Sequence, residues 1–360
     1  MNERQSLVAL YSYIYFGPAR TKLLVEYFSG ASGAWNSTKK ALLDIGLKSD
    51  RVENFIKYRE NFNSKIYFNR LKNLGIDYLT INDKDFPSNL KDLDNAPVVL
   101  YFKGRLKSDD SKAVAIIGTR KMTTYGREVT VRFSSELANL GITIISGLAL
   151  GVDACAHKAC IDAGGRTIAV LASGLDIITP ASNTQLAKSI IETGGAIVSE
   201  YPLGHPPLRT NFPNRNRIIS GLSSAVLVIE GANRSGTLLT ASSAAEQGRT
   251  VFAVPGQITS PMSVAPHFLI ANGAKMALNV KDILDELNLQ LGVDKEKLEK
   301  IMPETPEEEE LSEIIINEPM HLDEIVRISG LNVADISARL TIMELKGLVK
   351  SLGGGVYKKL

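Results

Sequence analysis

The sequence predicts an α/β protein built around an extended Rossmann-like, doubly wound sheet. Six short apolar runs recur along the chain, and each is followed by a glycine-containing turn and an amphipathic segment. Runs that are apolar throughout are typical of strands buried on both faces, and strands that alternate with helices form a parallel sheet. Such a sheet holds its ligand in a crevice at the carboxyl ends of the strands. The six runs are residues 113–117, 142–145, 167–171, 196–198, 225–229 and 250–254.

Changes in composition divide the 360 residues into five segments. We expect, in chain order, an N-terminal helical domain of the SAM or helix-hairpin-helix type, a connector that leads into the sheet, the Rossmann-like domain, an acidic linker that acts as a solvated spacer, and a winged-helix domain. These segments are residues 1–78, 79–112, 113–290, 291–310 and 311–360.

The two small helical segments have outlines that also occur in nucleic-acid-binding modules. In the first, helix-periodic residues flank the turn at residues 45–47, and such a hairpin either packs as a plain helical module or offers backbone N–H groups to a phosphate. In the last, three helices precede a glycine-rich hairpin at residues 353–355, as in a winged helix-turn-helix. Its third helix carries only Arg339 and Lys346 as bases, so DNA, a protein and a regulatory lid all stay open as its role.

The composition excludes several classes of protein. The 41 basic and 39 acidic residues leave a net charge of +2, which is too balanced to indicate nucleic acid by itself. Two cysteines exclude a disulfide scaffold, and the chain has no apolar run of 18 residues, so we expect no membrane span. Because the first residues also lack a secretory signal pattern, we expect a cytoplasmic protein.

Cofactor and metal motifs are missing from the sequence. It contains no P-loop, no G-x-G-x-x-G fingerprint, no H-E-x-x-H and no G-x-S-x-G, so we expect no cofactor and no phosphate hydrolysis. Cys155, His157 and Cys160 lie close together, but they fall on a predicted helix without a fourth ligand nearby. We therefore interpret them as core cysteines and a polar histidine, with no metal.

Three glycine-containing turns open helices after predicted strands, and each could hold an anion. Glycine lets the backbone approach a ligand, and a helix N-terminus offers free N–H groups and a positive dipole. Arg120 in the first turn adds a bidentate phosphate donor, whereas Asp153 in the second is expected to be a helix cap or first-turn acid. The turns are residues 118–120, 146–153 and 235–237.

The stretch from Tyr201 to Ile229 contains no Asp or Glu, and its arginines and asparagines surround Phe212. Several prolines and a glycine predict that its first half is a loop. Guanidinium groups pair with phosphates, amides read base edges, and an aromatic side chain in a loop accepts a stacked base at about 1–3 kcal/mol. The alternative is that Phe212 fills the core and the arginines are merely solvated. We favour ligand binding because this basic stretch falls at the expected crevice.

These motifs together resemble the DNA-processing protein A family (DprA, also called Smf). The motifs occur along the whole central domain in the same order as in the family. The helical N-terminus and the winged-helix C-terminus resemble accessory domains of longer members. The motifs that carry it are Gly118-Thr119-Arg120, Ser146-Gly147-Leu148-Ala149 with Gly151-Val152-Asp153 and His157, Ser199-Glu200-Tyr201-Pro202, Phe212-Pro213 with Arg215-Asn216-Arg217, Ser235-Gly236-Thr237 and Val254-Pro255-Gly256.

The resemblance implies a non-enzymatic protein that binds single-stranded DNA, protects incoming DNA during natural transformation and loads the recombinase RecA onto it. It also implies a homodimer joined through the Rossmann-like domain. By position, Arg120 and Arg209 would hold phosphates and Phe212 would border a base pocket. The rest of the implied groove is Gly118, Thr119, Gly147, Asn214, Arg215, Arg217, Ser235, Gly236 and Thr237.

Two other functions stay open. A nucleoside-monophosphate phosphoribohydrolase-like enzyme would use Ser235-Gly236-Thr237 with Glu246, although this glutamate lies nine residues beyond Thr237 instead of three. A nucleotide-sensing regulator would instead bind duplex DNA through its winged helix. For the favoured function, about four arginines on phosphates predict a slope of about −3 for log affinity against log salt.

Overall fold

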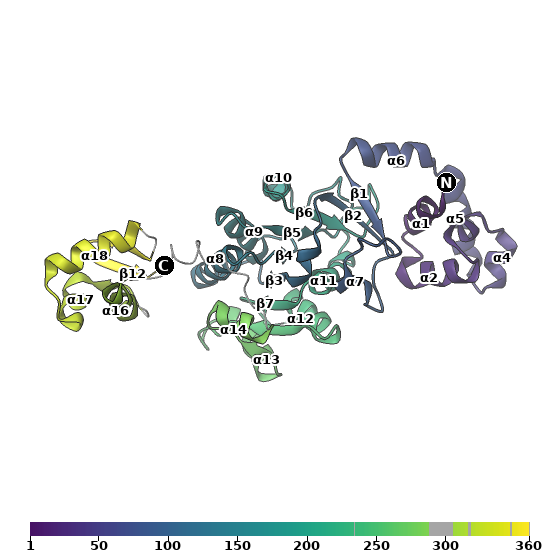
Figure 1. The fold of residues 1–360 in the computed structure, drawn as a ribbon. Coiled ribbons are helices and arrows are strands. Elements are labelled where there is room, and N and C mark those ends of the chain that lie inside the picture. The colour runs from purple at the N-terminus through teal and green to yellow at the C-terminus, as the bar shows by residue number, and fades with distance from the viewer. Residues whose placement is uncertain (234, 288–304, 316–317, 346–347, 360) are drawn as a thin grey trace. The chain divides into compact units, whose positions relative to one another are not determined.

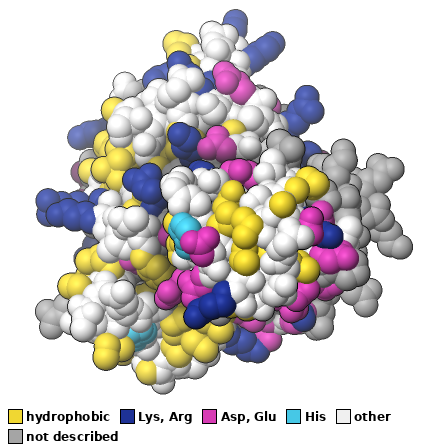
Figure 2. Space-filling model, turned by 90° about the vertical axis from the view of Figure 1, so that its left-hand side faces the viewer, with side chains coloured by type: hydrophobic (Ala, Val, Ile, Leu, Met, Phe, Trp, Pro, Cys, Tyr) yellow, Lys and Arg dark blue, Asp and Glu magenta, His cyan; other side chains and the backbone are white. Residues whose placement is uncertain are grey.

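The structure is a computed structural model, and it describes residues 1–233, 235–287, 305–315, 318–345 and 348–359. The chain forms two compact units, Met1–Leu289 and Gln290–Leu360. No helix in these described ranges is both long and apolar enough to cross a membrane. Basic and acidic side chains are interspersed on the face drawn in Figure 2, which agrees with the small net charge.

A nine-stranded sheet forms the centre of the first unit, and it confirms the predicted α/β architecture (Figure 1). Its strands lie in the order β1-β2-β6-β5-β4-β3-β7-β8-β9, and the run from β6 to β9 is parallel. All six predicted runs are strands of this parallel part. They are β3 (Val114–Ile117), β4 (Ile144–Ser146), β5 (Thr167–Val170), β6 (Ala196–Ser199), β7 (Ala225–Val228) and β8 (Thr250–Ala253).

The sheet extends beyond the six predicted apolar runs at both edges. A short strand, β9 (Lys275–Met276), pairs with β8, and the antiparallel strands β1 (Asp77–Thr80) and β2 (Val99–Gly104) continue the sheet from β6. The predicted connector therefore contributes a strand to the sheet and also holds the short helix α7 (Ser88–Lys91).

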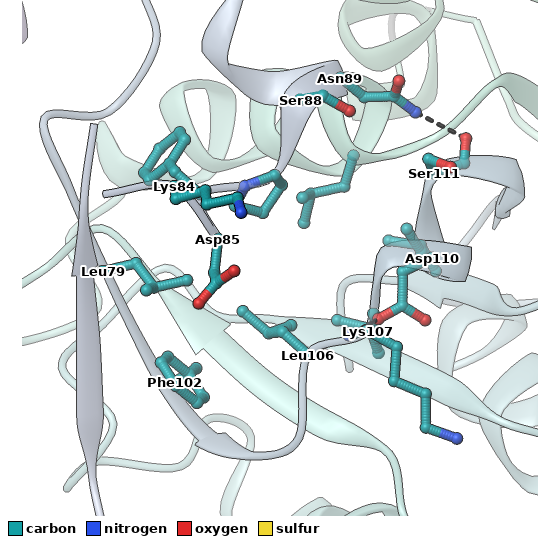
Figure 3. A pocket seen from close by; sticks show the side chains of 15 residues that line it. Leu79, Lys84, Asp85, Ser88, Asn89, Phe102, Leu106, Lys107, Asp110 and Ser111 are labelled. Atoms are coloured by element: carbon teal, nitrogen blue, oxygen red, sulfur yellow. Dashed lines mark hydrogen bonds between the residues drawn. The ribbon is translucent and has the colours of Figure 1, made fainter. Parts of the chain in front are cut away.

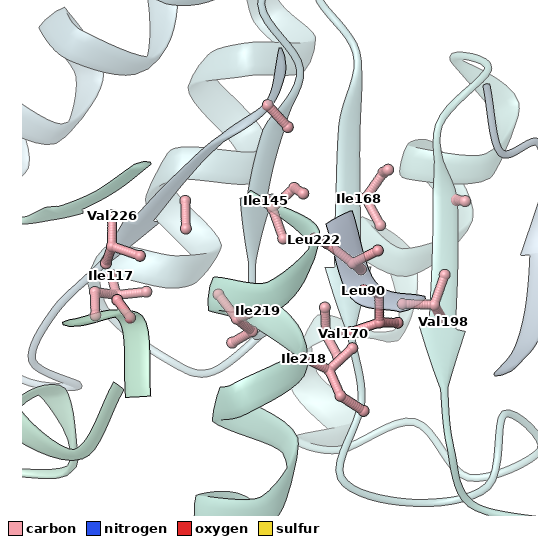
Figure 4. Packing of buried hydrophobic residues seen from close by; sticks show 14 of the residues in the cluster. Leu90, Ile117, Ile145, Ile168, Val170, Val198, Ile218, Ile219, Leu222 and Val226 are labelled. Atoms are coloured by element: carbon pink, nitrogen blue, oxygen red, sulfur yellow. The ribbon is translucent and has the colours of Figure 1, made fainter. Parts of the chain in front are cut away.

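Helices cover both faces of the sheet, as a doubly wound fold requires. The helices α8 (Thr124–Asn139), α9 (Val152–Asp162), α10 (Thr184–Glu192) and α14 (Val280–Glu286) pack on one face. The opposite face carries α7, α11 (Asn211–Leu222), α12 (Gly236–Glu246) and α13 (Val264–Ala271). Ile218, Ile219 and Leu222 of α11 contact the apolar side chains of β4, β5 and β6 (Figure 4). This burial, worth about 1.5–3 kcal/mol for each such side chain, fixes α11 on the sheet.

The direction of the chain reverses at β3. From β3 the chain proceeds through β4, β5 and β6 to one side, and α11 then carries it back to β7 on the other side of β3. This is a topological switch point, where open α/β sheets leave a crevice at the carboxyl ends of their strands.

The N-terminal helices belong to the same compact unit as the sheet, Met1–Leu289, and they also have a core of their own that includes Phe16, Trp35 and Phe55. Leu7, Val8 and Tyr11 of the first helix share a hydrophobic cluster with Val99 and Tyr101 of β2. Ala9 and Leu10 on its other side pack in the core of the N-terminal helices, so this helix is buried between that core and the sheet edge. The helices are α1 (Glu3–Tyr11), α2 (Gly17–Tyr27), α3 (Ala31–Asn36), α4 (Lys39–Asp44), α5 (Ser49–Asn61) and α6 (Ser64–Asn73).

The second unit is a winged helix, as predicted. Three helices pack around Leu311, Ile325, Ile336 and Leu340, and a three-stranded antiparallel sheet ends in the predicted glycine-rich hairpin. Its elements are α16 (Pro306–Ile314), β10 (Met320–His321), α17 (Leu322–Ser329), α18 (Val333–Leu345), β11 (Val349–Gly353) and β12 (Val356–Lys359).

The predicted acidic spacer is wrong for its last residues. Thr305 caps α16, Pro306 occupies its first turn, and Glu307, Glu308 and Glu309 follow in that turn. Acidic side chains are favourable at this end because the helix dipole is positive there, and a proline in the first turn removes no intrahelical hydrogen bond. Residues 291–304 of the predicted linker lie outside the described residues.

Candidate functional site

A cleft of about 400 Å³ lies at the switch point of the sheet, among the loop after β3, the loop after β4 and the first turns of α11 and α12. Cationic, aromatic and small polar side chains share its walls. The lining residues are Ile117, Gly118, Thr119, Arg120, Lys121, Ala149, Asp153, Phe212, Arg215, Asn216, Ile219, Ser235, Gly236, Thr237 and Thr240.

The loop after β3 is fixed by backbone hydrogen bonds on both sides. The Thr119 N–H donates to the Glu230 carbonyl at 2.8 Å, and the Thr119 carbonyl accepts from the Val152 N–H at 3.2 Å. A Cβ atom at Gly118 would lie 2.6 Å from the Val152 side chain, so only glycine fits there. This close packing holds Arg120 at the open rim, where its guanidinium carbon lies 5.3 Å from the centroid of the Phe212 ring.

Phe212 stands on a helix, which corrects the loop predicted for this stretch. Helix α11 begins at Asn211, and Pro213 is accommodated because the first turn of a helix needs no intrahelical N–H donor. Helical spacing of three and four then aligns Phe212, Arg215 and Asn216 on the face toward the cleft. Phe212 is half-buried in the cleft wall and belongs to none of the hydrophobic core clusters of the described residues, so the alternative of a core side chain is not supported.

Arg215 is the buried cation of the cleft. Its side chain donates to the Val170 carbonyl through Nη1 at 2.9 Å, while its buried Nε has no hydrogen-bond partner among the described residues. A Cβ atom at Gly147 would lie 1.6 Å from Nη1, so this glycine makes the space in which the guanidinium lies. Gly147 therefore acts beneath the cleft and is not part of its lining.

The charges around Arg215 favour an anionic ligand. Burial lowers the pKa of Arg215; the carboxylate of Asp153 opposes this change and the positive charge of Arg120 adds to it. Burial raises the pKa of Asp153, against the opposing effect of Arg215. The Asp153 carboxylate already accepts the Gly147 and Ala149 N–H groups, as expected of a first-turn acid. Arg120, Lys121 and Arg215 thus outnumber the one carboxylate of the lining.

The N-terminus of α12 closes the cleft with unpaired donors. Ser235 is the N-cap residue, but its side chain makes no capping hydrogen bond, and its buried Oγ has no partner within the part of the chain that the structure describes. Gly236 and Thr237 follow in the lining. Free N–H groups and the positive helix dipole make this turn a seat for phosphate or carboxylate.

Arg217 does not reach the cleft, contrary to prediction. Two residues beyond Arg215, it lies on another face of α11, where it forms a buried ion pair with Glu200 and donates to the Asn95 carbonyl at 2.6 Å. The Tyr11 hydroxyl donates to the same Glu200 oxygen, Oε2, at 3.0 Å. The charge of Arg217 is therefore neutralised inside the protein, and this contact joins α1 to α11.

Two other predicted residues also lie outside the lining. Arg209 is exposed just before α11, and Asn214 is exposed on the face of α11 that borders Arg217. The residues that the resemblance implied for the groove in turn did not include Lys121, Asn216 and Thr240, which the structure places in the cleft. For Asn216 a signal was available, because it follows Phe212 by four residues and would share its face if the stretch were helical.

Of the cysteine and histidine cluster, His157 and Cys160 are buried in the core, whereas Cys155 is half-buried, contrary to the prediction of two core cysteines. His157 is fully buried, its Nδ1 lies 2.6 Å from the Thr167 hydroxyl, and burial lowers its pKa to about 3. The Cys160 thiol donates to the Arg166 carbonyl at 3.2 Å, and burial raises its pKa to about 12. Nowhere in the described ranges do three His, Cys, Asp or Glu side chains gather in a way that could hold a metal ion.

A further cavity of about 530 Å³ lies near the amino ends of the strands, away from the switch point (Figure 3). Its walls are mainly hydrophobic, with Leu79, Phe102 and Leu106 among them. Two lysines and two aspartates line it, and Asp110 is already paired with Arg166. With balanced charges, this cavity is not suited to a polyanion.

The carboxylates that an enzyme of the phosphoribohydrolase type would need are placed elsewhere. Glu246 lies exposed at the end of α12, outside the cleft, and accepts the Ser242 hydroxyl at 3.1 Å. Glu230 accepts the backbone N–H and the hydroxyl of Thr123, which places it at the start of α8.

Two family models and several curated proteins match this chain. The model of the family described as DNA recombination-mediator protein A matches residues 77–288, and the model of the DprA winged helix domain matches residues 296–355. Protein Smf of Synechocystis sp. is 37% identical over 95% of both chains. Protein Smf of Escherichia coli is 38% identical over 88% of this chain and 86% of its own.

Two solved structures share the fold. DNA processing protein A (DprA) from Streptococcus pneumoniae has a TM-score of 0.65 and 33% identity, covering 77% of this chain and 96% of its own. DNA processing protein A from Helicobacter pylori has a TM-score of 0.53 and 30% identity, covering 59% of this chain and 97% of its own. The Helicobacter pylori structure is described for the unique single-stranded DNA binding mode of that protein.

Proposed function

Because the chain belongs to the DNA recombination-mediator protein A family, we propose that its switch-point cleft binds single-stranded DNA without breaking bonds. One observation carries this proposal: Arg120 and Arg215 both line the cleft at a helix N-terminus. Beside them lie Arg215 Nε and Ser235 Oγ, two buried polar atoms without a hydrogen-bond partner among the described residues. Two like charges in one cleft repel each other, and an anion placed between them relieves that repulsion.

The chemistry of the walls assigns a role to each group. A backbone phosphate fits between the Arg120 guanidinium and the first turn of α12, where Ser235 and Gly236 offer donors. A base fits against the Phe212 ring, and the amide of Asn216 lies one helical turn away to meet its edge. Arg209, exposed just before α11, would take the next phosphate along the strand.

The site is suited to binding and not to hydrolysis. Asp153 is the one carboxylate among the lining residues, it is engaged by backbone N–H groups, and the described lining contains no histidine. A general acid or base needs a titratable group within reach of the substrate. Incubation with nucleoside monophosphates should therefore release no free base, whereas release of base would favour the enzyme hypothesis.

We further propose that the protein protects incoming DNA during natural transformation and loads RecA onto it as a homodimer. The family description as a recombination mediator supports a recombinase partner. The dimer is supported by exposed apolar side chains at the β9 edge, where Phe268, Met276 and Leu278 are each about half exposed. Sedimentation should show a dimer that the Leu278→Glu variant converts to a monomer; an unchanged dimer would exclude this edge.

The experiment that tests the function is a competition between single- and double-stranded oligonucleotides at two salt concentrations. We expect preference for the single strand and an affinity that falls as salt rises, since cations on phosphates release counterions. A salt-independent affinity would contradict the proposal. Preference for duplex would instead favour the regulator that binds through its winged helix.

A further inference from the structure

The positive charge of the chain is concentrated in its N-terminal helices. Residues 1–76 hold twelve Lys or Arg against six Asp or Glu, whereas residues 77–360 hold 29 basic and 33 acidic side chains. The net charge of +2 therefore conceals a strongly basic helical segment next to a slightly acidic remainder. Such asymmetry is typical of a surface that meets a polyanion.

A groove of about 580 Å³ lies on this segment, between α5 and the turn after α1. Three tyrosines line it together with amide and charged side chains. Tyr13 lies 5.3 Å from Tyr15 and 5.3 Å from Tyr58, measured between ring centroids, and Tyr15 is 69% exposed. The lining residues are Tyr13, Tyr15, Asp50, Arg51, Asn54, Lys57, Tyr58 and Asn61.

One face of α5 supplies the polar side of this tyrosine groove. Asn54, Lys57 and Asn61 follow one another at spacings of three and four residues, so they project from the same face of the helix. Neither Arg51 nor Lys57 forms an ion pair with any described residue, whereas the nearby Glu53 is already paired with Lys39 at 3.0 Å.

The negative charge of Asp50 restricts the part of the groove that a polyanion can occupy. It lies in the first turn of α5 and contributes the one carboxylate of the lining. Its charge repels phosphates at that end of the groove, which leaves the Arg51 and Lys57 side for a backbone. An acidic peptide would meet the same restriction, but it would not use the exposed Tyr15 ring and the two amides.

From this arrangement we infer that the tyrosine groove is a second contact for the same single-stranded nucleic acid, an inference that rests on the proposed function. A base stacks on Tyr15, the amides of Asn54 and Asn61 meet base edges, and phosphates pair with Arg51 and Lys57. The bases of a single strand are free to stack in this way, whereas those of a duplex are already paired. Helices α1 to α5 lie beyond the β1 edge of the sheet in the same compact unit (Figure 1), so a single strand long enough to span the two sites would contact both.

Photo-crosslinking separates this inference from the proposed function. The full chain is irradiated with an oligonucleotide that carries 5-iodo-deoxyuridine, and the adducts are located by peptide mapping. We expect adducts in two places, the peptide with Phe212 and the peptide with Tyr13 and Tyr15. Adducts at Phe212 alone would overturn the second contact and leave the cleft intact. Adducts at neither place would overturn both, and adducts at the tyrosines alone would overturn the cleft.

Affinity measurements provide an independent check with a matched control. Tyr15→Ala removes an exposed ring and should weaken binding of a long single strand about fivefold or more. Lys57→Glu should weaken it as well and flatten its salt dependence, whereas Lys40→Glu makes the same charge change on α4, outside the groove lining. If the two lysine variants weakened DNA binding equally, the loss would reflect the overall charge of the N-terminal helices and not the groove, and the inference would be overturned. Groove variants that bind the oligonucleotide normally but lose an acidic peptide would overturn it too.

Discussion

Arg120 and Arg217 were predicted to play the same part, and the structure gives them opposite ones. Arg120 is exposed at the rim of the cleft, while Arg217 is buried against Glu200. Alanine at position 120 should flatten the slope of log affinity against log salt by about 0.7, the value of one phosphate contact on a single strand. Between about 50 and 200 mM salt, one contact changes the affinity by about 2.6-fold.

Alanine at position 217 should leave that slope unchanged and destabilise the fold. It leaves the Glu200 carboxylate buried with the Tyr11 hydroxyl as its remaining hydrogen-bond donor, and removing one partner of a buried pair costs about 3–5 kcal/mol. The assays are oligonucleotide titrations at several salt concentrations and urea unfolding followed by circular dichroism. The reasoning would be refuted if Arg217→Ala, still folded, flattened the slope by as much as Arg120→Ala does.

Three further predictions follow from buried atoms. Gly147→Ala should lower both unfolding free energy and DNA affinity, because its Cβ would lie 1.6 Å from the Arg215 guanidinium; unchanged titrations would contradict this. Ser235→Ala should leave stability unchanged, since its Oγ has no partner in the described part of the chain, yet weaken DNA binding about three- to tenfold if that hydroxyl meets a phosphate. Finally, the pKa of His157 is about 3 in the fold and 6.5 when unfolded, so the unfolded chain binds more protons as the pH falls. Between pH 6.5 and pH 3, urea unfolding should therefore show that the wild type loses up to about 1.4 kcal/mol more stability per pH unit than His157→Gln does.

The sequence was informative where local pattern and tertiary structure agree. The six apolar runs became parallel strands because each is buried on both faces, and the switch point follows from their order. The positions of Arg120, Ser235 and Gly236 in the cleft could be predicted because turns after parallel strands meet at one sheet edge.

The predictions were wrong where one local sequence signal is compatible with two different structures. Pro213 indicated a loop, yet it also suits the first turn of a helix, and only the anchoring of Ile218 and Ile219 on the sheet decides for the helix. The partner of Arg217 could not be predicted because Glu200 ends a different strand and Tyr11 comes from the N-terminal helices. Such contacts depend on the rotation of α11, which composition does not reveal.

The division of α11 into opposite faces makes this helix intolerant of insertions. Each residue turns a helix by about 100°, so one residue added between Arg217 and the anchoring Ile218 would swing the Phe212 ring out of the cleft. The same rotation would pull the Arg217 guanidinium away from Glu200 and detach the helix from α1. Single side chains along this helix can thus be substituted one by one, but an insertion within it would disrupt the cleft and the Glu200 contact together.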